Sequence, residues 1–263
     1  MDKLKNILES TYKLYHKTDY LKLDPLHCVH KFSKTNDIEI AGLLAAVLAY
    51  GRAEIIIRNV EAILDLTSRE PFKFTLNTTF KEKQIAFKGF KHRFNDGFDI
   101  ALLLESAAFC IRKYGSLEKM FLFSLQKDLS VKTGLDLFTG ELKKTGKEIA
   151  KREKTSFEYL LPSPVSGSAC KRLNMYLRWM VRKADTIDFG IWNSVSPSIL
   201  LIPVDTHIAK LGRKLKFTKR KNADWRMAEE ITAGLKKYDA MDPVRFDFSL
   251  CRAGMLTFRK DAA

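Results

Sequence analysis

One lysine and one aspartate of this 263-residue chain stand where their side chains could take part in the same chemistry. Lys171 begins an amphipathic segment after a turn rich in proline, glycine and serine, and Asp205 lies in Pro203-Val204-Asp205-Thr206-His207. A lysine in the first turn of a helix lies near the positive end of the helix dipole, which favours the neutral amine that Schiff-base chemistry needs. An aspartate at a helix start accepts backbone N–H bonds, stays ionised and can stabilise a developing cation. The alternatives are that Lys171 is an ordinary basic groove residue and Asp205 only a helix cap.

The charge of the chain indicates a polyanionic partner. Lysine and arginine number 46 against 31 acidic residues, which gives a net charge of +15 and a pI near 9.6. Residues 171–226 contain 13 basic and 4 acidic residues, so a net +9 falls within 56 positions. The segment 170–183 is predicted to be a basic amphipathic helix, because its apolar residues share one face and Arg172, Arg178 and Arg182 lie elsewhere on the helix. A basic face that serves only solubility is the alternative.

Helical periodicity dominates the apolar pattern and predicts an all-α fold. Two helices are expected within 37–66, where Gly51 and Arg52 interrupt the repeat. The helix 99–113 has Asp99 as its expected acidic cap and basic residues at its end. Further helices are expected over 117–126, within 134–151, and over 170–183, 206–215, 223–238 and 245–258. We find no strand pattern of note.

Several classes of protein lack their sequence signals here. The cysteines, which are 82, 60 and 81 residues apart, match no zinc, iron-sulfur or disulfide pattern, so no metal site is expected. His27, Cys28 and His30 are not expected to form a metal site, because adjacent side chains point apart. The phosphate-loop, dinucleotide, metalloprotease and hydrolase motifs are also missing. With no apolar stretch long enough to span a bilayer and no secretory signal, we expect no membrane association and a cytoplasmic location.

The hairpin, the lysine and the acidic motif together resemble the helix-hairpin-helix DNA glycosylase superfamily. The matching positions are 164–169 (PVSGSA) for the hairpin, Lys171 for the nucleophile and 204–207 (VDTH) for the acidic motif. The 34-residue separation of Lys171 from Asp205, without an iron-sulfur cysteine cluster, is most similar to the archaeal 8-oxoguanine DNA glycosylase branch. The segments LAAVLAYGR, FKHRF, KRLNMYLRWMVR and IPVDTH resemble an uncharacterised bacterial family allied to that branch.

This resemblance implies a fold and an activity. It implies that residues 1–263 form a single two-lobed helical domain with its active cleft between the lobes, and that 158–216 hold the hairpin, the catalytic helix and the VDTH segment. The implied activity is that of a bifunctional DNA glycosylase and AP lyase for an oxidised purine, most of all 8-oxoguanine. Lys171 would attack the sugar C1′ with help from Asp205 and no cofactor. The implied partner is double-stranded DNA with a damaged base, bound by a monomer. The alternative is a non-catalytic DNA- or RNA-binding protein on the same fold.

Further residues are expected to contact the DNA. Backbone N–H groups of the turn before Lys171 can hold a phosphate, although a plain capped turn is the alternative, and nearby cations can follow the backbone. The candidate phosphate contacts are Ser166, Gly167, Ser168, Arg172, Lys210 and Arg213. A damaged base turned out of the stack needs apolar walls and polar readers. The candidates are Tyr50, Arg52, Met175 and Asp247, each of which has a core or cap role as its alternative. His92 and Arg93 are left open between a contact to the opposite strand and an ordinary loop.

Overall fold

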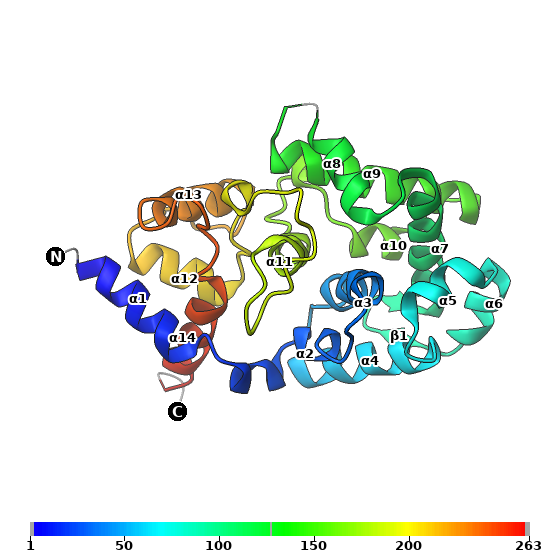
Figure 1. The fold of residues 1–263 in the computed structure, drawn as a ribbon, viewed down its shortest axis with the longest axis horizontal. Coiled ribbons are helices and arrows are strands. Elements are labelled where there is room, and N and C mark those ends of the chain that lie inside the picture. The colour runs from blue at the N-terminus through cyan, green and yellow to red at the C-terminus, as the bar shows by residue number, and fades with distance from the viewer. Residues whose placement is uncertain (1–2, 127, 261–263) are drawn as a thin grey trace. The chain divides into compact units, whose positions relative to one another are not determined.

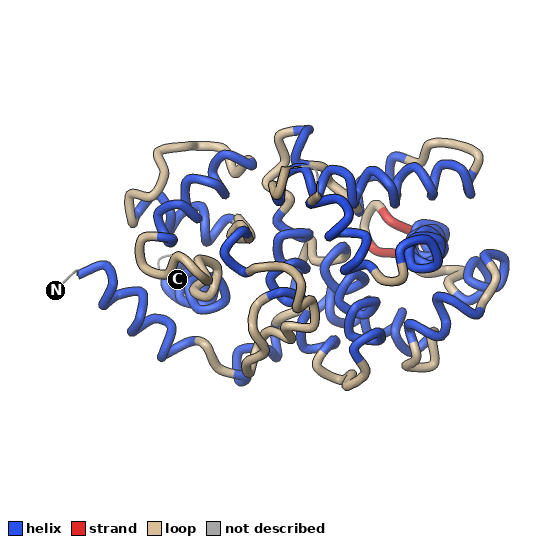
Figure 2. The backbone as a smooth tube through the Cα atoms, turned by 45° about the horizontal axis from the view of Figure 1, so that its top comes forward, coloured by secondary structure: helices blue, strands red, loops and turns tan. Residues whose placement is uncertain are grey.

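The computed structural model describes residues 3–126 and 128–260, and most of these residues are helical (Figures 1 and 2). The expected all-α class is confirmed. The chain divides into two compact units, a middle unit formed by Leu23–Ser163 and a terminal unit formed by Met1–Lys22 with Pro164–Ala263. The predicted segment 158–216 begins in the middle unit and continues in the terminal unit. Every helix within the described ranges is too short or too polar to cross a lipid bilayer.

The middle unit holds nine helices within the described residues and one antiparallel hairpin, drawn in red in Figure 2. The hairpin is a feature that the sequence analysis missed. The elements are α2 (Leu26–Val29), α3 (Thr35–Val47), α4 (Ala53–Leu66), α5 (Pro71–Asn77), α6 (Phe80–Ala86), β1 (Lys91–His92), β2 (Asn95–Asp96), α7 (Gly97–Tyr114), α8 (Leu117–Leu125), α9 (Val131–Ala150) and α10 (Thr155–Leu160).

The terminal unit is built from the two ends of the chain, and α14 packs against both α1 and α12. Its elements are α1 (Lys3–Tyr15), the 3-10 helix η1 (Thr18–Leu23) at the border of the units, η2 (Pro164–Ser166), α11 (Lys171–Val181), η3 (Pro197–Ile199), α12 (Thr206–Lys214), α13 (Trp225–Lys236) and α14 (Asp247–Lys260).

Helix α3 lies in the core of the middle unit and is buried from Asp37 to Val47. Two buried acidic residues in its first turns bind the starts of other helices. Asp37 accepts the N–H of Phe72 at 3.0 Å, and Glu39 accepts the N–H of Glu118 at 3.1 Å. These carboxylates satisfy N–H groups that helix starts leave without intrahelical partners, which compensates for burying their charge.

Helix α7 begins earlier than its periodicity predicts. Its cap is Asp96, which accepts the N–H of Asp99, while Asp99 accepts the N–H of Asp96 in return. The expectation that Asp99 is the cap is therefore wrong by three residues: Asp99 is the reciprocal member of a capping box. The first residue of the helix, Gly97, packs so closely that an added Cβ would lie 1.8 Å from the carbonyl oxygen of Phe87.

Helix α11 is buried on nearly all sides, so the prediction of a basic amphipathic helix is wrong. Arg178 and Arg182 are only 3% and 4% exposed, and buried aspartates pair with both of them. The sequence could not show this, because a helical wheel does not distinguish an arginine that is paired in the core from one that is exposed to solvent.

The close packing of Gly97 predicts a large loss of stability in Gly97→Ala. Because the clash is with backbone, which cannot rotate away, we expect the free energy of unfolding to fall by more than about 2 kcal/mol. The matched control is Gly140→Ala in α9, where a Cβ would meet nothing within 4 Å. That exposed helical site should gain roughly 1 kcal/mol from higher helix propensity. Urea unfolding of both variants measures the difference, and equal effects would contradict the packing described here.

Candidate active site

The turn before α11 is held in place by the start of α13. Gly167 has φ +81°, the left-handed region that favours glycine, and a Cβ there would meet nothing within 4 Å. Its carbonyl accepts the N–H of Trp225 at 3.2 Å, and Ser168 forms an isolated β-bridge with Asp224. Cys170, the N-cap residue of α11, is also left-handed with φ +45° and provides no side-chain cap. The first turn of α11 therefore starts from a constrained turn without a side-chain cap from its N-cap residue.

Lys171 is the first residue of α11 and is half-buried. Asn174 ties this turn of the helix to the preceding loop, because its side-chain amide donates to the carbonyl of Ala169 at 3.0 Å. The sequence analysis did not single out Asn174. Met175 lies one turn after Lys171 and is 7% exposed, whereas Arg172 is 9% exposed and offers little surface to a phosphate.

Asp205 is the N-cap of α12, as its motif predicts. Its Oδ1 accepts the N–H of Ile208 at 2.8 Å, and its Oδ2 accepts the S–H of Cys251 at an Sγ–Oδ2 distance of 3.4 Å. Among the described residues Asp205 forms no ion pair within 4.0 Å. Its charge is therefore held by one backbone donor and one weak thiol donor and is not neutralised by a cation.

Cys251 on α14 contacts the candidate carboxylate, because its S–H donates to Oδ2 of Asp205 at 3.4 Å. Burial raises the pKa of its thiol well above the usual value, the carboxylates of Asp205 and Asp247 raise this pKa further, and the cations Arg252 and Lys171 act in the opposite direction. Cys251 was not predicted from the sequence. The available signal was its position four residues after Asp247, which places both on one helical face.

Asp247 is buried rather than placed on the surface. It is 4% exposed, and its Oδ2 lies 2.5 Å from Nη1 of Arg178. Burial raises the pKa of Asp247 to about 6, the charge of Arg178 opposes this rise, and the carboxylate of Asp205 adds to it. Asp247 thus faces the same small region of the terminal unit as Asp205 and Cys251.

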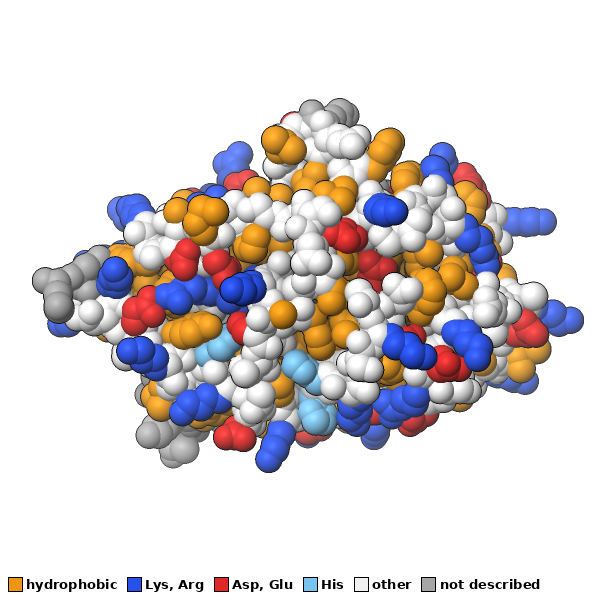
Figure 3. Space-filling model, in the orientation of Figure 1, with side chains coloured by type: hydrophobic (Ala, Val, Ile, Leu, Met, Phe, Trp, Pro, Cys, Tyr) orange, Lys and Arg blue, Asp and Glu red, His pale blue; other side chains and the backbone are white. Residues whose placement is uncertain are grey.

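The predicted phosphate contacts differ in their exposure. Ser166 and Lys210 are exposed, and Ser168 is half-buried. Arg213 donates through Nη1 to the carbonyls of Arg220 and Lys221 at 3.3 and 3.4 Å, so it also holds the loop that follows α12. Figure 3 shows lysine and arginine side chains spread over the face it presents, several of them beside acidic side chains.

Tyr50 and Arg52 belong to the middle unit, unlike the other predicted site residues. The Tyr50 hydroxyl donates to Oδ1 of Asn95 at 2.5 Å, and its ring is partly exposed. Arg52 is the N-cap residue of α4 and is exposed. Lys171, Asp205 and Asp247 therefore belong to the terminal unit, whereas Tyr50 and Arg52 belong to the middle unit.

One protein family accounts for nearly the whole chain. A family model described as "Protein of unknown function (DUF2400)" matches residues 24–256. The chain belongs to this family. The match extends over most of the middle unit and over α11, α12 and the described start of α14, so every candidate site residue named above lies inside it. No curated protein and no solved structure matches the chain.

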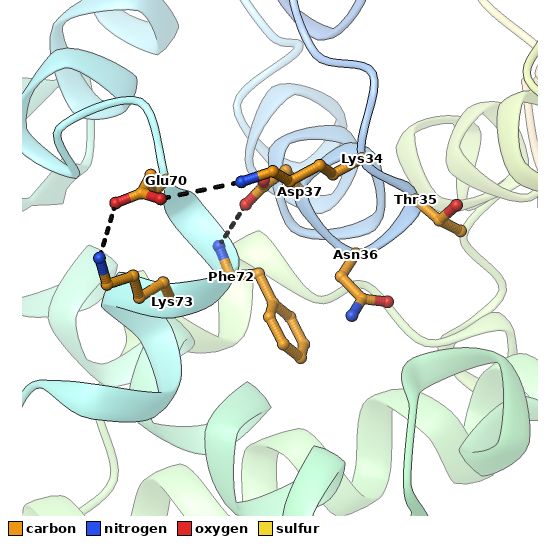
Figure 4. A pocket seen from close by; sticks show the side chains of 7 residues that line it. All are labelled: Lys34, Thr35, Asn36, Asp37, Glu70, Phe72 and Lys73. Atoms are coloured by element: carbon orange, nitrogen blue, oxygen red, sulfur yellow. Dashed lines mark hydrogen bonds and ion pairs between the residues drawn. The ribbon is translucent and has the colours of Figure 1, made fainter.

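A separate pocket of the middle unit has its charges already satisfied. Its lining comes from the starts of α3 and α5, where Glu70 pairs with Lys34 at 3.8 Å and with Lys73 at 2.9 Å, and Asp37 accepts the N–H of Phe72 (Figure 4). These contacts serve the helix starts. No group of three or more potential metal ligands occurs within the ranges 3–126 and 128–260.

The raised pKa of Asp247 predicts a pH-dependent difference between the wild type and Asp247→Asn. In the unfolded chain this carboxyl titrates near 4, so its contribution to stability is fully present below about pH 4 and is lost as the pH rises through about 6. The asparagine side chain does not titrate. The difference in the free energy of unfolding should therefore move in favour of the variant from about pH 4 to pH 7, by up to about 3 kcal/mol. Urea unfolding across this range measures it, and a constant difference would show that Asp247 does not titrate as described.

Proposed function

We propose that the chain is a bifunctional DNA glycosylase and AP lyase on a two-lobed helix-hairpin-helix fold. The observation that carries the proposal is that Asp205, the N-cap of α12, lies beside Cys251 of α14 in the same unit as Lys171, the first residue of α11. An amine at the start of one helix and an unpaired carboxylate at the start of another are the two groups that Schiff-base excision of a base requires. The resemblance of the hairpin, Lys171 and VDTH to helix-hairpin-helix glycosylases supports the same activity.

The reaction proceeds from the amine of Lys171. Its nitrogen lone pair attacks C1′ of the damaged nucleotide, and the electron pair of the breaking N-glycosidic bond leaves with the base, which takes up a proton. The attached amine then loses a proton, its lone pair forms the C=N bond as the C1′–O4′ bond breaks, and O4′ takes up a proton, so that a protonated imine joins Lys171 to C1′. Loss of a C2′ proton from this imine expels the 3′ phosphate by β-elimination and nicks the strand. No metal or organic cofactor takes part in this scheme.

Asp205 acts while the glycosidic bond breaks. The sugar becomes cationic in the transition state, and a fixed carboxylate beside it lowers the barrier. Because the N–H of Ile208 holds one oxygen and the S–H of Cys251 donates to the other, Asp205 is oriented, and no described cation pairs with it. A hydrogen-bonded, preorganised group of this kind does not have to reorganise during the reaction.

The substrate in this proposal is duplex DNA that contains an oxidised purine, with 8-oxoguanine first among the candidates. The turn at Gly167 leads into the start of α11, which has no side-chain cap from Cys170 and where a phosphate is favoured. Lys210 and Arg213 follow on α12 and make the sequence-independent contacts that position a strand. Met175 and Asp247 of the terminal unit are the proposed readers of the base. A protein that binds nucleic acid without excising a base is the alternative outcome of the tests below.

Asp205→Asn separates the role in capping from the role in excision. Asparagine caps a helix about as well as aspartate, so the free energy of unfolding should change by no more than about 1 kcal/mol. Loss of the charge should slow single-turnover excision by about a hundredfold or more. The control is Ser116→Ala, which removes the cap of α8 in the middle unit. That variant should lose stability and excise normally. If Asp205→Asn excises at the rate of the wild type, Asp205 is a structural cap only.

Lys171→Gln tests the nucleophile itself. Glutamine keeps part of the reach of the side chain but cannot form an imine, so base release, strand cleavage and the borohydride-trapped adduct should all disappear. Binding to the same duplex should persist, because a single positive charge is lost. Lys183→Gln, which removes an exposed charge of the terminal unit, is the matched control and should trap normally.

The measurement is a denaturing gel of labelled duplexes that contain 8-oxoguanine, uracil or an abasic site. Trapping by Lys171→Gln at the level of the wild type would show that another residue is the nucleophile. Binding by the wild type without trapping or cleavage on any of the three duplexes would replace the enzyme with the non-catalytic alternative.

A further inference from the structure

The hairpin of the middle unit ends in an exposed aromatic residue beside an arginine. Strands β1 and β2 pair His92 with Asn95, which leaves Arg93 and Phe94 as the two-residue loop. The ring of Phe94 is 58% exposed, and the guanidinium carbon of Arg93 lies 5.7 Å from its centroid. Arg93 has φ +53°, a conformation that favours glycine and that a bulky residue keeps only when its surroundings impose it.

Buried hydrogen bonds fix the strands that carry this loop. Asn59 donates to the carbonyl of Lys91 at 3.2 Å and lies 2.9 Å from Nδ1 of His92. Asn95 donates to Asp99 at 2.8 Å, and Asp99 in turn accepts from Lys154 at 2.5 Å. Since Asn59, His92, Asn95 and Asp99 are buried, their hydrogen bonds fix the base of the hairpin and present its tip as a rigid feature.

Two tyrosines extend the aromatic surface of the tip. The ring of Tyr159, from α10, has its centroid 5.4 Å from Phe94 and 5.1 Å from Tyr50, and both contacts are edge-to-face. Tyr159 is itself 43% exposed. Large exposed aromatic residues that gather on one surface mark an interaction site more often than residues that occur singly. We call Tyr50, Phe94 and Tyr159 the aromatic platform.

Cations surround the aromatic platform. Arg52, Lys91 and Arg93 are exposed, and none of the three forms an ion pair with another described residue. The Arg93 side chain lies across Gly51, where an added Cβ would be 3.2 Å from its Cδ. The nearby carboxylate of Asp96 is neutralised by Lys154 at 2.9 Å, and Glu158 is the exposed acidic neighbour of Tyr159 in the chain. The cations near the platform are thus available to an external anion.

We propose that the aromatic platform binds an unstacked base of a DNA strand, while Arg52 and Arg93 contact the neighbouring phosphates. Aromatic faces beside a basic surface are the arrangement by which proteins hold unpaired bases, since every base has a face that can stack. A second copy of the chain would set these cations against one another, which disfavours self-association as the use of this surface. The proposal goes beyond excision, because the middle unit contains neither Lys171 nor Asp205.

The test compares Phe94→Ala with the wild type in binding to fluorescein-labelled duplexes that either are fully paired or carry one bulged nucleotide. The wild type should prefer the bulged duplex. Phe94→Ala should bind the bulged duplex roughly tenfold more weakly, while Phe94→Trp retains affinity because it keeps an aromatic face. The matched control is Phe123→Ala on α8, which removes an aromatic ring of similar exposure from another surface of the same unit and should bind as the wild type does.

Arg93→Gln should reduce the salt dependence of binding by about one phosphate contact.

The other outcomes either contradict the proposal or show whether base binding by the aromatic platform and base excision are independent. Equal affinity of Phe94→Ala and the wild type for the bulged duplex overturns it, as does a wild type that binds neither duplex. A platform that serves self-association would instead shift the size-exclusion profile of Phe94→Ala with no change in DNA affinity, which also overturns it. Weaker binding by Phe94→Ala in a protein that excises no base supports the platform while the proposed enzyme fails. Excision by a protein whose affinity is insensitive to Phe94→Ala overturns the platform and leaves the proposed enzyme standing.

Discussion

The site in the terminal unit depends on the pairing of two buried arginines with buried aspartates. Arg178 bridges Asp188 at 3.2 Å and Asp247 at 2.5 Å, and Arg182 also pairs with Asp188 and reaches Asp242 at 2.9 Å. A buried charge is tolerated only when it is paired, and removal of one partner typically costs about 3–5 kcal/mol. These pairs join α11 to α14 and to the loops beside them. They thereby fix the distance between the start of α11, which carries Lys171, and the face of α14.

Because of this pairing, the charged groups that stabilise the fold differ from the carboxylate that is available for the proposed chemistry. Arginines in the middle and at the end of α11 are neutralised by aspartates, so they add little to the positive field that the composition suggests. Asp205 is the acidic residue of the cluster that no cation neutralises, and it lies at a helix start with one oxygen fixed by Ile208. The pKa of Asp247 is raised mainly by burial, which disfavours the charged form, and the carboxylate of Asp205 adds a smaller rise against the opposing charge of Arg178.

Local pattern predicted most helices, because a repeat of apolar residues is a property of neighbouring positions. It also placed Asp205 correctly at a helix start. It could not place Arg178 in the core, since the partner Asp247 is 69 residues away in the chain. It missed the hairpin at Arg93, because strands of two residues are too short to show an alternation. Cys251 was missed for a third reason: its spacing from Asp247 shows a shared helical face but not its contact with Asp205, which another helix brings within 3.4 Å.

The state of Cys251 bears on which residue can act as the nucleophile. A thiolate beside Asp205 would compete with an amine, since thiolates are strong nucleophiles toward carbon. Burial and two neighbouring carboxylates raise the pKa of this thiol well above its usual value, which keeps it protonated at neutral pH. A protonated thiol cannot attack, but it can donate its hydrogen bond to Asp205 and help to hold that carboxylate in place. The same negative charges that keep Cys251 protonated are the ones that a cationic sugar would require, and the proposed mechanism therefore assigns the nucleophile to Lys171.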